Sequence, residues 1–192
     1  DIYGSKEAYL ESFRHYTELI QPGGALIIHT DLEMKANVQE GVKIYEYSLD
    51  KGDFHAENIK IENGNITFDF ISPIESIKNV ELGNPVPINI ENGIAAMAMA
   101  QLNGCTAEEL KYGMATYHGV DRRFDFSLKN DRHVLISDYA HHPKEIYQSA
   151  KSIKQLYSNR KITAIFQPHL YTRTRDFYKE FADALSQLDE VI

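Results

Sequence analysis

The order of strands and helices expected after residue 122 is the feature of the sequence that most limits its fold. Apolar periodicity and turn signals predict strands at 124–128, 134–137, 161–166 and 190–192, and helices at 143–157 and 177–188. The resulting order is β-β-α-β-α-β. Alternating elements of this length predict a parallel sheet with helices on both faces, as in a doubly wound (Rossmann-like) α/β domain.

The first part of the chain has a different pattern. A helix is expected over 6–20 with Ser5 as its N-cap, and the apolar run 25–28 is typical of a buried parallel strand. Alternation over 43–70 then predicts a β-rich part with a hairpin turn at Asn63-Gly64. This part therefore combines helix and sheet.

Two consecutive helices are expected after these strands. The first contains many small apolar residues and ends at Asn103-Gly104, and the second opens with a capping box from Thr106 to Glu109. The pattern changes again after them, so we expect a domain boundary near 119–122. The predicted domains are 1–119 and 120–192.

Composition excludes several classes of protein. The 192 residues, 43% of them hydrophobic, suffice for a packed core, and a net charge of -8 argues against a nucleic-acid partner. Cys105 is the only cysteine, which excludes an intrachain disulfide and a four-cysteine zinc site and fits a reducing, cytoplasmic setting. No signal-peptide pattern or apolar run of ~20 residues occurs, so no membrane partner is expected.

The stretch "SDYAHHPKE" at 137–145 gathers a carboxylate, a phenol and two imidazoles ahead of its proline. Adjacent side chains such as His141 and His142 diverge on a strand and do not meet on a helix, so the pair alone is a poor chelator. Another interpretation remains open. The stretch is equally typical of a helix entrance with Pro143 in the first turn.

Two polar loops follow expected parallel strands. The carboxyl ends of such strands form the ligand crevice of an α/β sheet, so the loops after 137 and after 166 are expected to share one cleft. Helix N-termini and arginines, including Arg122 and Arg123, favour a carboxylate or phosphate there, although single arginines are often only surface residues. The side chains expected in this cleft are Asp138, His141, His142, His169, Tyr171, Arg173 and Arg175.

Four strings together carry a family resemblance: "NIENGIAAMAMA", "GVDRRFD", "DYAHHPKEI" and "FQPHLYTRTRDF". In this order and spacing, the chain resembles the Mur ligases of bacterial cell-wall synthesis over nearly its whole length. The "QPHxYTRTRD" string favours the member that joins L-alanine to UDP-N-acetylmuramate.

The resemblance implies a three-domain enzyme. ATP phosphorylates the muramoyl carboxylate with the help of magnesium, and the amine of L-alanine attacks the acyl phosphate. Residues 1–119 would be the later half of a mixed-sheet central ATPase domain, and 120–192 most of the C-terminal domain. Neither G-x-x-x-x-G-K-[ST] nor G-x-G-x-x-G occurs, so the phosphate loop and main magnesium ligands are expected upstream of Asp1. We expect 1–192 alone to be inactive.

The resemblance also assigns site residues. Asn89 and Asn92 match adenine contacts, although Asn is also an ordinary capping residue. The other matches are Arg122 and Arg123 for ribose and phosphates, Asp138 for ribose hydroxyls, His141 and His142 for the amino-acid side, and His169, Tyr171, Thr172 and Arg173 for the muramoyl group and alanine. His141, His142 and Arg173 are the catalytic candidates.

The chain departs from the usual family pattern at four positions. Ile88 replaces a histidine near the adenine, and Leu170 replaces an arginine after the "QPH" string. Ser137 stands where an aspartate is usual, and Ala140 where a glycine is usual. "DYAH" is typical of relatives that add later amino acids, whereas "PHLYTRTRD" favours the alanine-adding member.

Two other function classes remain open from the residues alone. A metal-dependent hydrolase could use Asp138, His141 and His169 as ligands. Such an enzyme would contain stoichiometric zinc or manganese after purification. A non-catalytic binding module is the second alternative, and it predicts no response to adenine nucleotide in the complete protein.

Overall fold

The computed structural model describes residues 3–62 and 64–192, and the chain forms two compact units. The first unit comprises Asp1–Ile59, Phe68–Val80 and Ile90–Lys111. The second comprises Lys60–Thr67, Glu81–Asn89 and Tyr112–Ile192. The two units are therefore interleaved along the chain.

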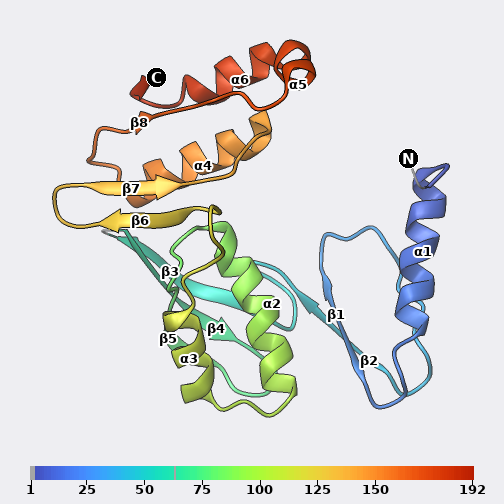
Figure 1. Ribbon diagram of the computed structural model, residues 1–192. Helices are drawn as coiled ribbons and strands as arrows, with labels where there is room; N and C mark the ends of the chain where they lie inside the picture. Colours follow the sequence, from blue (N-terminus) through green and yellow to red (C-terminus); the bar gives the residue numbers. More distant parts are fainter. Residues whose placement is uncertain (1–2, 63) are drawn as a thin grey trace. The chain divides into compact units, whose positions relative to one another are not determined.

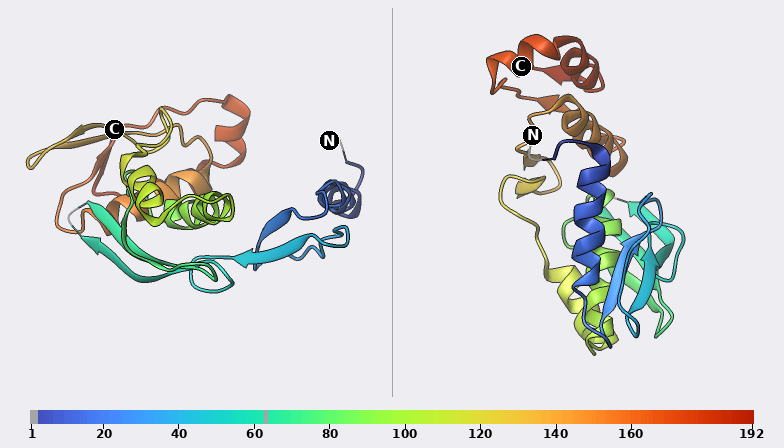
Figure 2. Two further views of the ribbon diagram at one scale, coloured as in Figure 1. Left: turned by 90° about the horizontal axis from the view of Figure 1, so that it is seen from below. Right: turned by 90° about the vertical axis from the view of Figure 1, so that its right-hand side faces the viewer.

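Helix α1 (Lys6–Glu18) opens the first unit. The hydroxyl of Ser5 accepts a hydrogen bond from the Ala8 N–H at 3.1 Å, which confirms the predicted N-cap. The helix lies beside the β1–β2 pair (Figures 1 and 2). Thr17, which is buried, exchanges two hydrogen bonds of 3.0 Å with the backbone of Asn37 and so joins the helix to the connection between these strands.

Strands β1 (Ala25–His29) and β2 (Lys43–Tyr47) are parallel, and His29 lies opposite Tyr47. The predicted strand at 25–28 is therefore confirmed, one residue longer than expected. The second sheet has the order β3-β4-β5, formed by His55–Glu62, Asn65–Ile71 and Ile77–Glu81. Of the predicted turn between β3 and β4, Asn63 lies outside the described residues, and Gly64 has a positive φ of 75°.

Alternation puts the apolar side chains of β4 on one buried face. Ile66, Phe68 and Phe70 are almost completely buried there, as is Val80 of β5. Helix α2 (Ile88–Leu102) buries Ile90, Gly93, Ile94, Met97, Ala98 and Gln101. The Gln101 side chain donates to the Glu75 carbonyl at 2.9 Å. The buried side chains of β4, β5 and α2 form the core of this part of the chain.

Helix α3 (Ala107–Thr116) follows α2 after Gly104, whose φ is +89°. Glu109 accepts from the Thr106 N–H at 2.8 Å, and the Glu109 N–H donates to the Thr106 hydroxyl at 3.3 Å. These reciprocal bonds confirm the predicted capping box.

In the second unit, β6 (Asp125–Lys129) and β7 (Val134–Ser137) form the predicted antiparallel hairpin. Next come α4 (Pro143–Leu156), β8 (Thr163–Ala164), α5 (Tyr171–Asp176), α6 (Tyr178–Leu185) and β9 (Glu190–Val191). Ile146 of α4 packs with Phe181 and Ala184 of α6 in a buried cluster. Segment 171–176, expected as a loop, is a short helix.

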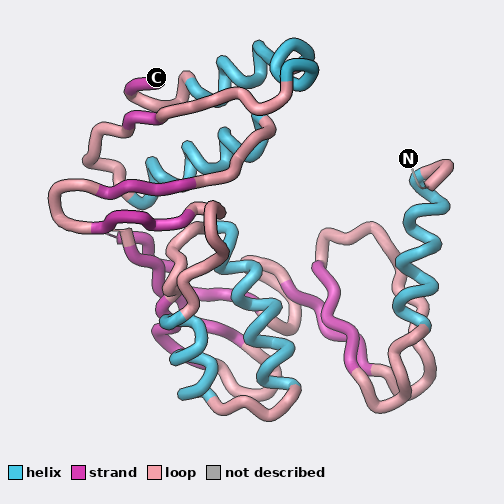
Figure 3. Tube along the Cα trace, viewed as in Figure 1, coloured by secondary structure: helices cyan, strands magenta, loops and turns pink. Residues whose placement is uncertain are grey.

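The predicted parallel pairing is confirmed for β8 and β9, in which Thr163 lies opposite Glu190. Strand β7 does not join them: it is hydrogen-bonded only to β6 among the described strands (Figure 3). A cavity of about 750 Å³ lies between β7, α4 and β8, lined by side chains such as Ile136, Ile153 and Ile165. A continuous sheet from β7 to β8 was therefore a wrong prediction.

Gly83 offers a test of the close packing in the second unit. Its N–H donates to the Met114 carbonyl at 2.9 Å, and a Cβ would overlap the Ala115 carbonyl and lie 2.6 Å from that of Tyr117. We expect Gly83→Ala to lower the free energy of unfolding by about 2 kcal/mol or more, measured by urea denaturation.

Gly113→Ala is the matched control. It lies within α3 with nothing within 4 Å of the added Cβ, so it should raise stability by about 0.5–1 kcal/mol. An unfolding midpoint for Gly83→Ala at or above that of the unaltered protein would contradict the packing described here.

Candidate functional site

One backbone hydrogen bond joins two of the predicted site loops in the second unit. The Tyr139 N–H, just after β7, donates to the Arg122 carbonyl at 2.6 Å. The adjacent carboxylate of Asp138 accepts a short hydrogen bond from the Ser149 hydroxyl of α4. Arg122 and Asp138, which flank the β6–β7 hairpin, are therefore held in one neighbourhood.

The arginine loop has an unusual backbone. Arg122 and Phe124 have positive φ values of 60° and 51°, a left-handed conformation that residues other than glycine rarely adopt. An isolated bridge pairs Val120 with Arg123, and the Phe124 ring is buried. The buried ring and the bridge offset strain of about 1–3 kcal/mol per residue. The side chains of Arg122 and Arg123 remain exposed.

His142 and Glu145 cap the start of α4. The His142 ring accepts from the Lys144 N–H at 3.4 Å, and Glu145 accepts from the N–H groups of His141 and His142 at 2.9 and 3.0 Å. The hydrogen bond from the His141 N–H is the main cause that lowers the pKa of Glu145 below its ordinary value. The helix-entrance interpretation is thus confirmed for His142.

The hydrogen bonds give the two neighbouring imidazoles opposite proton positions. His141 Nδ1 lies 3.0 Å from the Tyr139 carbonyl, which can only accept, so this nitrogen carries the proton. His142 Nδ1 accepts from a backbone N–H, so in the neutral ring its proton is on Nε2. His141 therefore offers a lone pair at Nε2, whereas His142 offers an N–H.

Arg173 connects the third loop to this neighbourhood. It lies in α5 and donates from Nη1 to the His141 carbonyl at 3.4 Å. The aromatic ring of Phe177, just after α5, lies 5.3 Å from that of His142. Arg175 instead forms an exposed ion pair with Asp176 at 2.8 Å, as expected for a surface arginine.

The other predicted residues of this loop are His169, Tyr171 and Thr172. All three are exposed, Tyr171 at 83%. The described hydrogen bonds connect none of these side chains to the loop at 138–142. Their proposed role as substrate contacts remains a prediction.

The other candidates lie in the first turns of α2. The Asn89 side chain donates to the Asn84 carbonyl at 3.4 Å, and Asn92 is exposed. Asn92 belongs to the first unit, whereas Arg122 and Asp138 belong to the second.

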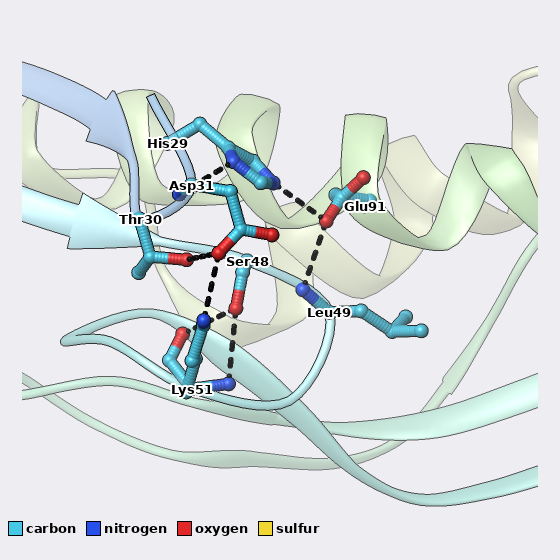
Figure 4. A network of polar contacts seen from close by, with 7 residues as sticks. All are labelled: His29, Thr30, Asp31, Ser48, Leu49, Lys51 and Glu91. Carbon is cyan, nitrogen blue, oxygen red and sulfur yellow. Dashed lines mark hydrogen bonds and ion pairs between the residues drawn. The ribbon is translucent and has the colours of Figure 1, made fainter. Parts of the chain in front are cut away.

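Sequence reasoning missed a polar network next to Asn92, shown in Figure 4. Glu91 accepts from His29 Nε2 at 2.9 Å and from the Leu49 N–H at 3.0 Å. Asp31 pairs with Lys51 at 2.7 Å, and this bond lowers the pKa of Asp31 and raises that of Lys51. The sequence signal that could have revealed this network was His29 and Asp31, which follow the apolar strand at 25–28.

Within residues 3–62 and 64–192, no group of three or more His, Cys, Asp or Glu side chains is arranged to hold a metal ion. Asp138, His141 and His169 therefore do not form a metal cluster. None of the described helices combines the length and apolar character needed to cross a bilayer.

Two family models match the chain. The Mur ligase middle domain matches residues 1–100, and the Mur ligase glutamate ligase domain matches residues 122–192. The chain belongs to the Mur ligase family, which confirms the resemblance found in its sequence strings.

Curated relatives match along the entire chain. It is 66% identical over 192 residues to UDP-N-acetylmuramate–L-alanine ligase from Phocaeicola vulgatus, and 60% identical over 193 residues to the enzyme of that name from Parabacteroides distasonis. In both comparisons the chain spans 42% of the relative's length.

Solved structures support the predicted mixed α/β fold. The crystal structure of UDP-N-acetylmuramate–alanine ligase from Thermotoga maritima matches with a TM-score of 0.78 at 23% identity, covering 98% of this chain and 41% of that one. The ligase for UDP-N-acetylmuramoyl-L-alanyl-D-glutamate and 2,6-diaminopimelate matches with a TM-score of 0.74 at 24% identity, covering 100% and 40%. At these identities the likeness shows the fold alone.

The capping box of α4 leads to a pH-dependent prediction. Glu145→Ala removes an acceptor from two backbone N–H groups, so it should cost about 1 kcal/mol of stability near neutral pH. The pKa of Glu145 is lowered in the folded state, so its contribution is present above the ordinary value of 4.5 and is lost as pH falls through the folded pKa. Urea denaturation should show the deficit at about pH 7 and a smaller deficit at a pH well below 4.5.

Glu180→Ala is the matched control, because Glu180 also lies in a first helical turn, that of α6. Its side chain has no hydrogen bond among the described contacts, so we expect a change within about 0.5 kcal/mol. A deficit for Glu145→Ala that equals this control at both pH values would contradict the capping role.

Proposed function

We propose that the full-length protein is an ATP-dependent ligase that joins L-alanine to UDP-N-acetylmuramate in peptidoglycan synthesis in the cytoplasm. The observation that carries the proposal is the series of contacts from Arg122 through Tyr139 and His141 to Arg173. It occurs in a chain that is 66% identical to a protein with this name.

In the proposed reaction, the terminal phosphoryl group of ATP passes to the muramoyl carboxylate and gives an acyl phosphate and ADP. The amine of L-alanine then attacks the carbonyl carbon. Phosphate leaves, and the nitrogen loses a proton as the amide bond forms. Charge develops on oxygen in both steps, so fixed cationic and N–H groups lower the barriers.

For the nucleotide, we propose that Asn89 and Asn92 contact the adenine and that Asp138 accepts from the ribose hydroxyls. Arg122 and Arg123 then contact the phosphates. The backbone strain at Arg122 supports this role, because strained residues cluster at binding sites and need support from their surroundings. The same loop is tied to Asp138 through Tyr139.

For the amino acid, we propose unequal roles for the two histidines. The Nε2 lone pair of His141 can accept a proton or hydrogen bond from the alanine amine, whereas His142 both caps α4 and offers an N–H. Arg173 contacts a carboxylate through its planar fork. His169, Tyr171 and Thr172 complete the substrate loop in this proposal.

Magnesium is the metal that the family implies. The described residues contain no group of three or more His, Cys, Asp or Glu side chains that could hold a metal ion. We propose that 1–119 belongs to a central ATP-binding domain and 120–192 to a C-terminal domain.

Arg173→Lys tests the proposed substrate contact. Lysine keeps the charge but loses the bidentate fork, so we expect transition-state stabilisation to fall by ~1.5–3 kcal/mol. Steady-state kinetics of the full-length protein at saturating ATP should show a lower kcat/KM for L-alanine or the UDP-sugar.

Arg175→Lys is the matched control, because Arg175 pairs only with exposed Asp176 among the described contacts. It should leave both kcat/KM values unchanged. If Arg173→Lys gives the same values as Arg175→Lys, the assignment of Arg173 is wrong.

A further inference from the structure

A single carboxylate oxygen joins three segments of the first unit. Glu91 Oε1 accepts from His29 at the end of β1 and from the Leu49 N–H after β2 (Figure 4). Glu91 itself lies in the first turn of α2. Its carboxylate therefore fixes this turn against the ends of both parallel strands.

The orientation of His29 is set on both sides of its ring. Nδ1 accepts from the Asp31 N–H at 3.1 Å, so the proton of the neutral ring is on Nε2 and points to Glu91. The Tyr47 ring lies edge-on at 5.2 Å from the imidazole. The side chains of His29 and Glu91 are only 29% and 27% exposed, so water competes less with their contact than with a surface pair.

The first turn of α2 has other hydrogen bonds as well: the Asn89 N–H donates to the Val86 carbonyl at 2.8 Å, and the Asn89 side chain donates to the Asn84 carbonyl at 3.4 Å. Ile88, its first residue, is 60% exposed, while Ile90 and Ile94 are buried. The first N–H groups of a helix have no partner within the helix, and this end can fray. The two hydrogen bonds to Glu91 oppose such fraying at the residue directly before Asn92.

We propose that Glu91 is a positioning residue for an adenine nucleotide, acting through Asn92 and Asn89 with His29 as its support. This inference rests on the proposed function, in which these amides contact the adenine. Amide side chains recognise a base only when they are held close to the productive geometry, within about 0.5 Å. The carboxylate of Glu91 supplies that restraint and does not itself touch the nucleotide.

A simpler role would be the favourable charge of an acidic residue at a helix N-terminus. The two roles respond differently to Glu91→Gln. Glutamine loses the charge, but its single amide oxygen can still accept from both His29 and Leu49. Positioning predicts that glutamine restores function and alanine does not, whereas a charge effect predicts that both variants lose it.

The experiment compares Glu91→Ala and Glu91→Gln in the full-length protein by steady-state kinetics. Glu91→Ala should raise the KM for ATP about tenfold, which corresponds to ~1.4 kcal/mol. The KM values for L-alanine and UDP-N-acetylmuramate should not change. Glu91→Gln should stay within about twofold of the unaltered protein, and His29→Ala with Glu91→Ala should be non-additive.

Glu108→Ala is the matched control. Glu108 is an exposed acid in the first turn of α3, and its side chain makes no hydrogen bond or ion pair among the described contacts. It should leave the KM for ATP unchanged. Equal loss in Glu91→Gln and Glu91→Ala would overturn the positioning role.

Asn92→Ala separates this inference from the proposed function. If it weakens ATP binding while Glu91→Ala does not, the positioning role alone is wrong. If Asn92→Ala has no effect on ATP binding, the adenine assignment fails, and this inference fails with it. Weaker ATP binding in both variants, with rescue by Glu91→Gln, supports the proposal.

Discussion

The hydrogen bond between the Tyr139 N–H and the Arg122 carbonyl is the interaction on which the candidate site depends. It holds the strained arginine loop against the loop that follows β7. In the loop after β7, the His141 ring donates to the Tyr139 carbonyl, and the His141 N–H donates to Glu145 in the capping box of α4. The His141 carbonyl accepts from Arg173. The arginine loop, the loop after β7 and helix α5 are therefore joined by hydrogen bonds to the carbonyls of Arg122, Tyr139 and His141.

Backbone contacts of this kind give the two histidines different roles. The His142 ring accepts from a backbone N–H at the start of α4, and the His141 ring donates to a backbone carbonyl. The Glu145 carboxylate, 3.4 Å from His141 Nδ1, also favours a proton on this nitrogen. The His142 ring therefore caps α4, while the neighbouring His141 ring keeps a lone pair on Nε2.

Local patterns predicted most of the elements. The Ser5 cap, the Thr106 capping box and the β6–β7 hairpin depend on neighbouring residues, so the sequence contains their signals. The contact of Arg173 with the His141 carbonyl agrees with the predicted grouping of these segments, but the parallel pairing from which the grouping was argued does not occur among the described strands, because β7 pairs with β6 and β8 with β9. The cap, the capping box and the hairpin are set by short-range chemistry.

Features that depend on non-local contacts were not predictable. Strand β7 pairs with β6, and a cavity separates it from β8. The alternation of apolar residues predicts a strand but does not identify the strand with which it pairs. The Glu91–His29 contact joins residues 62 positions apart. Short helix α5 was missed because its six residues are too few for a periodic apolar face.

The most direct measurement of the central claim is product analysis with the full-length protein. It would be incubated with ATP, magnesium, UDP-N-acetylmuramate and L-alanine, and the mixture would be analysed by mass spectrometry. We expect UDP-N-acetylmuramoyl-L-alanine and ADP in equal amounts, formed only when both the UDP-sugar and L-alanine are present. No such product, or ligation only to a UDP-sugar that already carries an amino acid, would contradict it.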